Sequence, residues 1–411
     1  MSLKFSSIFI VSLLTSPLLA STEISNLVAE VLQKNPEIAY YEAAITVANG
    51  QRDDAGKLAN PELTTQLARW SPAAGDGVSW QAGISQTFEW PGRLGLRKAI
   101  ADGSIRVARI GLEAFKASLA AKTRILAVEM LMAQEKTSAA DAAIARVSGV
   151  ISVLVQRDPS SPAPLLETRI LEANAVTLSR QASQARQAMD AARVELNLLR
   201  GIRPDAALSI TPSEFKLPPC QPLPKLLAFA DRNNFDIRSR QTELRQQGFA
   251  VDLARNEKGP AITVAPFVAG QNAGADRETT AGLSLSIPLP LWNRNKGNED
   301  IANARCQQAK TSLLVTIRDV GKQITLHRLT YTRQTEEMAQ WRPNIMASFR
   351  EAAESADRHY QLGAISVSTY LEMQKSYLEA LDALQNTQAE ALTSLLNLEL
   401  LTGLNLQTGD K

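Results

Sequence analysis

Two short stretches of the chain, residues 80–89 and 280–289, alternate between apolar and polar side chains. One face of this pattern carries Trp80, Ala82, Ile84, Phe88, Ala281, Leu283, Leu285, Ile287 and Leu289. A period of two with one apolar face is typical of a half-buried β-strand. With their neighbours, these stretches predict four strands, at residues 61–70, 79–90, 260–269 and 279–290.

Helical periodicity dominates the rest of the chain, which is rich in Leu, Ala, Gln, Glu and Arg, the composition of long helices. A helix over residues 96–156 would be a rod of roughly 90 Å at 1.5 Å per residue. A compact enzyme domain has no use for such a rod. The pattern predicts helices at 24–58, 95–156, 165–200, 224–257, 297–358 and 367–402.

The chain is internally duplicated. NPEI at 35–38 resembles NFDI at 234–237, an offset of 199 that Gly83 and Gly282 also keep. Farther along, LNLLRG at 196–201 matches LELLTG at 398–403. Self-similarity at one period indicates a repeated structural unit. We predict a first repeat at 21–210, made of a helix, two strands and a long helical hairpin. A proline-rich linker follows at 211–224, then a second repeat at 225–404 and a tail at 405–411.

The first twenty residues have the layout of a secretory signal peptide. Lys4 precedes an apolar run at residues 5–14, and Pro17 and the small Ala20 follow it. The run is shorter than the ~20 residues that a spanning helix needs. We therefore expect residues 1–20 to be removed on export.

Tryptophans lie at the predicted strand ends, at Trp70, Trp80, Trp90 and Trp292. Transmembrane barrels carry aromatic girdles at both membrane interfaces. From Trp80 to Trp90 is about 33 Å along a strand, which a tilt near 45° reduces to roughly 24 Å, close to the ~25 Å apolar band of such barrels. The tryptophans therefore favour a membrane-spanning sheet over a soluble one. On this interpretation the lipid-facing residues are Ala82, Ile84, Phe88, Leu283, Leu285 and Ile287.

Four strands do not close a barrel. Open strand edges in hydrocarbon leave backbone groups unpaired at several kcal/mol each. The sheet must therefore close through other copies of the chain. Two copies give eight strands with a filled interior, and three give twelve strands with room for a passage; we favour three.

Composition excludes several other classes. The 411 residues are 45% hydrophobic with a formal net charge of +2, so no basic footprint for nucleic acid is present. Cys220 and Cys306 are expected to be unpaired, and the only histidines, His327 and His359, have no metal-ligand spacing. Recognisable catalytic motifs are absent. We expect no enzyme, no cofactor and no dedicated metal site.

Together with the duplication, the stretches QTFEWPGRLGLR at 86–97 and SIPLPLWNRNKGN at 286–298 resemble those of the TolC-type outer-membrane efflux channels. The resemblance covers essentially the whole chain after the signal peptide and is strongest to the heavy-metal, CzcC-like branch. PLPLWNRNKG is the most branch-specific stretch, whereas YQLGAISVSTYLEMQKSYLEA at 360–380 and LLTG at 400–403 are family-wide.

The resemblance implies a mostly α fold with a transmembrane β part. Three chains would form one twelve-strand barrel in outer-membrane lipid, continued by a long α-helical coiled-coil barrel in the periplasm of a Gram-negative cell. It also implies three kinds of protein partner, namely two further copies of the chain, a periplasmic membrane-fusion adaptor and an inner-membrane RND pump.

Two helical-hairpin tips are implied as adaptor contacts. The second tip, YQLGAIS at 360–366, matches the family pattern, whereas the first, RDPSSPAP at 157–164, carries Ser161 where the pattern has glycine. The candidate contact residues are Asp158, Ser160, Ser161, Leu362, Gly363 and Ser366.

Three acids precede the second tip at i, i+3 and i+6, and they are Glu351, Glu354 and Asp357. Threefold symmetry would turn them into rings that attract cations at a constriction of the tunnel. Arg350 and Arg358 flank them, so pairing on a solvated outer face explains the pattern as well, and we favour that simpler interpretation.

The cargo stays open at this stage. We expect an exit duct for heavy-metal cations, with organic compounds or secreted polypeptide as the alternative. A soluble periplasmic coiled-coil adaptor is the competing interpretation from another class of protein.

Overall fold

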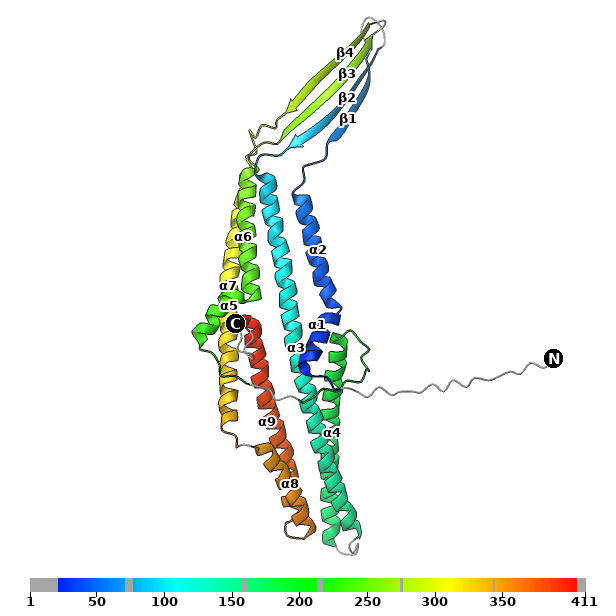
Figure 1. Cartoon of the computed structure of the whole chain (residues 1–411), viewed down its shortest axis with the longest axis vertical. Coiled ribbons are helices and arrows are strands. Elements are labelled where there is room, and N and C mark those ends of the chain that lie inside the picture. The colour runs from blue at the N-terminus through cyan, green and yellow to red at the C-terminus, as the bar shows by residue number, and fades with distance from the viewer. Residues whose placement is uncertain are drawn as a thin grey trace, which may run out of the picture. The chain divides into compact units, whose positions relative to one another are not determined.

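A computed structural model describes residues 21–70, 77–156, 162–212, 217–273, 276–342 and 344–404. The first half of the chain forms α1 (Ile24–Lys34), α2 (Glu37–Ala55), β1 (Glu62–Trp70), β2 (Gly77–Phe88), α3 (Arg93–Gln156) and α4 (Pro162–Leu199). The second half forms α5 (Leu223–Asn233), α6 (Phe235–Asn256), β3 (Ile262–Ala273), β4 (Asp276–Ser286), α7 (Lys296–Ala339), α8 (Ile345–Gln361) and α9 (Val367–Thr402) (Figure 1).

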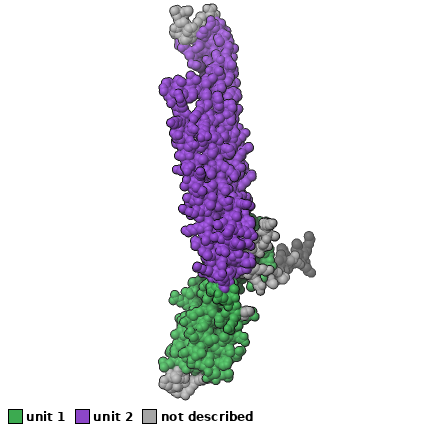
Figure 2. Space-filling view, turned by 90° about the vertical axis from the view of Figure 1, so that its left-hand side faces the viewer, with its two compact units in different colours: residues 1–35, 120–216, 337–389 green, residues 36–119, 217–336, 390–411 purple. Residues whose placement is uncertain are grey.

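The predicted fold class is confirmed, because the described chain is mainly helical with one four-stranded antiparallel sheet. Both halves run through two helices, a strand hairpin and long helical arms in the same order. Two compact units, coloured in Figure 2, each draw segments from both halves. Unit 1 comprises residues 1–35, 120–216 and 337–389, and unit 2 comprises residues 36–119, 217–336 and 390–411.

Three predicted helices are each broken in two. The predicted helix 24–58 divides at Asn35 and Pro36, and the predicted helix 224–257 divides at Asn234, whose side chain caps α6 by accepting from the Ile237 N–H. The predicted helix 297–358 ends at Ala339 and restarts at Ile345, after Asn344 with a left-handed φ of 60°. Asparagine tolerates that conformation and favours caps, so local chemistry overrides the helical periodicity.

The duplicated asparagines make duplicated contacts. In unit 1, the buried Asn35 side chain donates from Nδ2 to the Leu199 carbonyl at 3.0 Å. In unit 2, Asn234 Nδ2 donates to the Leu401 carbonyl at 2.9 Å. Both acceptors lie in the last turn of a long helix, where carbonyls lack partners within the helix. Each repeat therefore ties its first helix pair to the end of its own last helix.

Unit 1 has a core shared by α3, α4, α8 and α9. Its buried members recur at helical spacing and comprise Ala143, Val147, Val150, Leu154, Leu171, Leu178, Ala356, Val367, Tyr370 and Leu371. Within the described residues, α3 is the one helix long and apolar enough to cross a membrane by length and composition. Packing of its apolar stripe in this core accounts for that composition.

The sheet lies in unit 2, with strand order β1-β2-β3-β4 and antiparallel pairing throughout. Its register pairs Leu63 with Ile84, Gly83 with Phe267, and Pro266 with Leu283. Several predicted strand bounds were wrong, with the largest differences at the ends of the third and fourth strands. The third strand continues to Ala273 instead of 269, and the fourth ends at Ser286 instead of 290. Pro288 and Pro290 lack the N–H that a longer fourth strand would need.

Candidate functional site

The register extends the two-faced pattern across all four strands. One face carries Leu63, Leu67, Trp80, Ala82, Ile84, Val264, Val268, Leu283 and Leu285. These side chains do not form a covered core, because Leu67 is 81% exposed and Leu283 is 68% exposed. An apolar face of this extent on a folded chain marks a surface that meets lipid or another protein.

The opposite face is mostly polar. It carries Thr64, Gln66, Gln81, Ser85, Thr87, Thr263, Gln271, Glu278, Thr280 and Ser284. Phe267 is a large apolar residue on this face. It lies in the cross-strand position between Gly83 and Gly282, and a Cβ on Gly282 would approach the Phe267 ring to 2.7 Å. Gly282 therefore makes room for the aromatic ring, and Gly83 allows the close approach of the β3 backbone at Pro266 and Phe267.

The predicted lipid-facing residues fall on the apolar face with one qualification. Ala82, Ile84 and Phe88 in β2 share a face with Leu283 and Leu285 in β4. Ile287 follows the last residue of β4 and is exposed.

The predicted interface tryptophans occupy different environments. Trp80 lies within β2, and a Cβ on Gly270 of β3 would come within 2.6 Å of its Nε1, so the ring covers that glycine. Trp90 lies two residues beyond β2 and covers Gly259 in the same way. Trp292 follows β4 and is 94% exposed. Trp70 ends β1, and its side chain lies outside the described part of the chain.

A buried arginine locks the turn after β2 to the second half of the chain. Arg93, 9% exposed, donates from Nη2 to the Gly259 carbonyl at 2.9 Å and to the Asn256 carbonyl at 3.3 Å. Asn256 Nδ2 in turn donates to the Pro91 carbonyl at 2.9 Å. We call residues 89–93 the first elbow. Sequence reasoning missed this joint, although the quoted stretch FEWPGR contains its arginine.

The second helical tip closes with a Schellman motif. The Ala364 N–H donates to the His359 carbonyl, the Gly363 N–H donates to the Tyr360 carbonyl, both at 2.9 Å, and Gly363 has a φ of +72°. A glycine there avoids the steric cost that Cβ brings at positive φ. Ser366 Oγ then accepts from the Thr369 N–H and caps α9. Leu362 stands at this turn 81% exposed. The first-tip candidates Asp158, Ser160 and Ser161 lie outside the described residues.

Residues 226–404 match the family model described as "Outer membrane efflux protein". The second half of the chain therefore carries the sequence pattern of this family. The chain is 23% identical over 336 residues to the cobalt-zinc-cadmium resistance protein CzcC of Cupriavidus metallidurans, covering 79% of this chain and 76% of that one. It is also 23% identical over 422 residues to the pyoverdine export outer membrane protein OpmQ of Pseudomonas putida, covering 92% and 85%.

Solved structures show the same fold. The Campylobacter jejuni CmeC outer membrane channel superimposes with a TM-score of 0.72 at 15% identity, covering 94% of this chain and 87% of that one. Likeness at this identity shows the shared fold, and the match of residues 226–404 to an outer membrane efflux protein model agrees with the predicted outer-membrane location.

The three acids before the second tip do not share one environment. Glu351 and Glu354 are exposed on α8, whereas Asp357 is half-buried and accepts from Gln361 at 3.1 Å. Burial, with the Asp357 carboxylate second, raises the pKa of the buried Tyr370 hydroxyl strongly. Asp357 thus faces the core of unit 1, and only the two glutamates remain on the surface.

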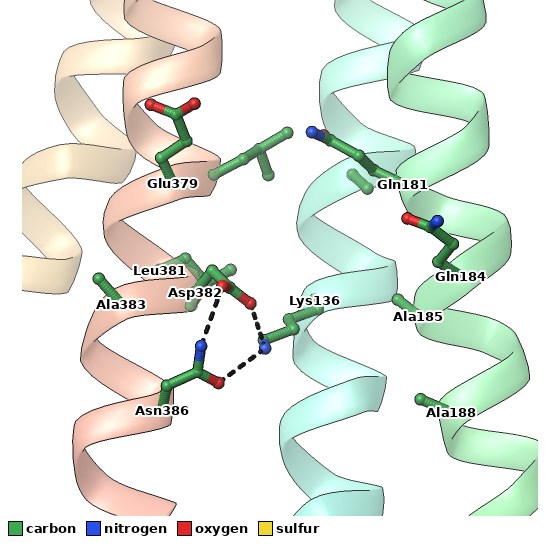
Figure 3. A pocket seen from close by; sticks show the side chains of 12 residues that line it. Lys136, Gln181, Gln184, Ala185, Ala188, Glu379, Leu381, Asp382, Ala383 and Asn386 are labelled. Atoms are coloured by element: carbon green, nitrogen blue, oxygen red, sulfur yellow. Dashed lines mark hydrogen bonds and ion pairs between the residues drawn. The ribbon is translucent and has the colours of Figure 1, made fainter.

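A groove of about 690 Å³ runs between α9 on one side and α3 and α4 on the other (Figure 3). Lys136 of α3 pairs with Asp382 of α9, and Asn386 Nδ2 donates to the same carboxylate at 3.0 Å. Glutamine and alanine side chains of α4, among them Gln181 and Ala185, line the facing wall. This arrangement ties α3 to α9 by an ion pair and leaves the groove wide.

Within the described residues, no three His, Cys, Asp or Glu side chains lie close enough to hold a metal ion. Cys220 and Cys306 are free thiols and half-buried. Burial raises the pKa of the Cys220 thiol, which keeps it protonated near neutral pH.

Proposed function

We propose that the chain is the outer-membrane duct of a tripartite efflux system that expels heavy-metal cations. The observation that carries this proposal is the similarity to the cobalt-zinc-cadmium resistance protein over 79% of the chain. The stretch PLPLWNRNKG at 288–297, typical of the metal branch, supports it. The duct works as a homotrimer with a periplasmic membrane-fusion adaptor and an inner-membrane RND pump.

The need for several copies follows from the sheet. Strands β1 and β4 are its two edges, and their outward backbone groups have no partner strand within the described chain. In hydrocarbon such groups cost several kcal/mol each. Three copies supply twelve strands, which pair both edges of every chain and enclose a passage lined by the polar face.

A duct needs no tight metal site of its own. Conduction requires that an ion leave as readily as it enters, so strong ligand clusters would slow transport. The polar face offers hydroxyls and amides with few charges. Selection of the cargo then lies with the pump and adaptor.

The adaptor is expected to meet the exposed helical tip. Leu362, Gly363 and Ser366 are the contact residues that we propose on this tip, and Asp158, Ser160 and Ser161 are those on the first one. Glu351 and Glu354 are exposed acids on α8, the helix that leads into the second tip. They remain candidates for a cation-attracting ring with Asp357.

The test is deletion of the gene, followed by growth on cobalt, zinc, cadmium, nickel, copper and silver beside a panel of dyes. The proposal predicts lower tolerance to at least one metal, restored by the intact chain on a plasmid. Sensitivity to dyes but to no metal would overturn the metal assignment.

A second candidate keeps the duct and changes the cargo. The similarity to a pyoverdine export protein covers 92% of this chain, which favours an organic compound, and secreted polypeptide is a further cargo of the same kind. The growth panel separates metals from organic cargo. The soluble adaptor alternative predicts instead that the protein is released in osmotic-shock fluid, which the exposed apolar face makes unfavourable.

A further inference from the structure

The chain contains one complete elbow joint and a second elbow whose large apolar side chains are exposed. In the complete joint, Trp90 covers Gly259 and Arg93 donates to the carbonyls of Asn256 and Gly259. These acceptors lie at the end of α6 and in the connector that leads to β3. The first elbow of one repeat is therefore held by the helix-to-strand connector of the next repeat.

The second elbow, residues 288–295, has the same backbone design. Asn295 has a φ of 58° and Gly92 a φ of 89°, and each offers its carbonyl to the first helical N–H, from Glu299 and Leu96 respectively. Lys296 begins α7 as Arg93 begins α3. Both elbows thus connect a strand to a long helix with the same backbone geometry.

The surroundings of the two elbows differ. At the second elbow, Leu289 is 70% exposed, Leu291 is 62% exposed and Trp292 is 94% exposed. Three large apolar side chains in sequence with so little cover indicate a surface that another molecule buries.

The matching connector is also open. Residues 56–61 link α2 to β1 as residues 257–261 link α6 to β3, and residues 57–61, KLANP, are all exposed. The offset of 199 places Gly259 at Asn60, next to the exposed Leu58. An elbow with an exposed tip and an exposed connector therefore exist in the same chain, each equivalent to one half of the joint already formed. Both are anchored within the chain, because Asn295 Nδ2 donates to the Ala254 carbonyl at 2.8 Å and the Ala59 carbonyl accepts from Gln86 Nε2 at 3.0 Å.

We propose that the second elbow of one copy binds the 57–61 connector of a second copy and so repeats the Trp90–Arg93 joint between chains. This proposal rests on the proposed trimer and assigns the residues of its seam. Trp292 covers the connector at Leu58 to Asn60, and Lys296 donates to the connector carbonyls. Each chain gives one elbow and receives one, so the contacts run head to tail and close into a ring.

The test places the photo-cross-linker p-benzoylphenylalanine at Trp292 in the full chain in outer-membrane vesicles. The proposal predicts covalent dimers and trimers after irradiation. Tryptic digestion cleaves after Lys57 and Arg69, so the cross-linked peptide should be residues 58–69. The matched control carries the probe at Trp90, which should attach within the chain to the peptide 259–277 and leave the chain mass monomeric.

A cross-link from position 292 to any other peptide, or only within one chain, would overturn the seam. The cargo proposal fails separately, because labelling of 58–69 together with normal metal tolerance in the deletion strain would keep the seam and remove the metal assignment. As a second readout, Trp292→Ala and Leu58→Ala should each lower the temperature at which the trimer dissociates. In the double variant this dissociation temperature should be little lower than in either single variant. Trp292→Phe should retain most of the trimer's stability.

Discussion

The side-chain amide of Asn234 donates to the backbone carbonyl of Leu401 at 2.9 Å, and the same side chain accepts from the Ile237 N–H at 3.0 Å. One buried residue thus caps the start of α6 and satisfies a carbonyl at the end of α9. Asn234→Ala removes both bonds and should cost about 2–3 kcal/mol. Asn234→Asp keeps the cap but cannot donate to Leu401, so it should lie between the alanine variant and the unchanged protein.

Thermal unfolding of the detergent-solubilised protein checks this ranking. Asn174→Ala is the control, since Asn174 bonds its own helix on an exposed face and its loss should change stability by no more than about 0.5 kcal/mol. Equal effects at Asn234 and Asn174 would contradict the tie between the two helices.

Replacing Arg93 by lysine or by methionine should destabilise the protein. Its guanidinium bonds two carbonyls and the Asn256 side chain at once, a pattern that a single ammonium does not reproduce. Arg93→Met should cost about 2–3 kcal/mol and Arg93→Lys somewhat less. The comparison is Arg240→Met, which removes only an exposed pair with Glu243. Unfolding curves that do not separate the Arg93 and Arg240 variants would show that the first elbow is not held in this way.

Charge on the two faces of β4 should have opposite consequences. Leu285→Lys puts an ammonium in hydrocarbon, which costs ~2–4 kcal/mol near mid-bilayer and less toward the interfaces. Ser284→Lys points to the aqueous passage and should be tolerated. The yield of folded protein in the outer membrane measures both, and Ile84→Lys against Ser85→Lys repeats the comparison in β2. Similar losses within each pair would reverse or remove the assignment of faces.

Alkaline pH should release the Tyr331 tether. The Tyr331 hydroxyl donates to the Pro218 carbonyl at 2.6 Å, and burial, with nearby Cys220 and Glu399, raises its pKa to about 12. Because the pKa in the folded protein lies above the ordinary tyrosine value of 10.0, this contribution is complete below pH 10 and is lost as pH rises toward 12. Tyr331→Phe should therefore be less stable than the unchanged protein at pH 8, and the gap should narrow by pH 12. A gap that stays constant would contradict the tether.

The sequence predicted the elements that a strong period defines. Alternation located β2 and β4, their neighbouring extended runs gave β1 and β3, and the long helices α3, α4 and α9 followed from apolar spacing and composition. The sequence did not predict the helix breaks, because at each break one or two residues set the backbone conformation. Asn234 is helix-compatible by pattern, and its role as a cap depends on Leu401, which is 167 positions away.

For the candidate site, the sequence predicted only which face of its own strand each side chain occupies. Ile84 and Leu285 were assigned to one face from period two, and the register shows them on one side of the sheet. The Arg93 joint was not foreseen, because its acceptors are backbone carbonyls 163 and 166 positions away. Carbonyl acceptors carry no side-chain signature, so no sequence pattern marks them. The contact of the Trp90 ring with Gly259 was not predicted either, because the two residues lie far apart in the sequence.

The central claim is that the apolar face of the sheet meets lipid while the other face meets water. It is tested most directly by spin labels placed one at a time at residues 281–286, in a variant with Cys220 and Cys306 replaced by serine, reconstituted in lipid bilayers. We predict that collisions with oxygen dominate at 281, 283 and 285, and that collisions with a water-soluble nickel chelate dominate at 282, 284 and 286. Equal access of the nickel chelate at neighbouring positions, with no alternation, would contradict the account.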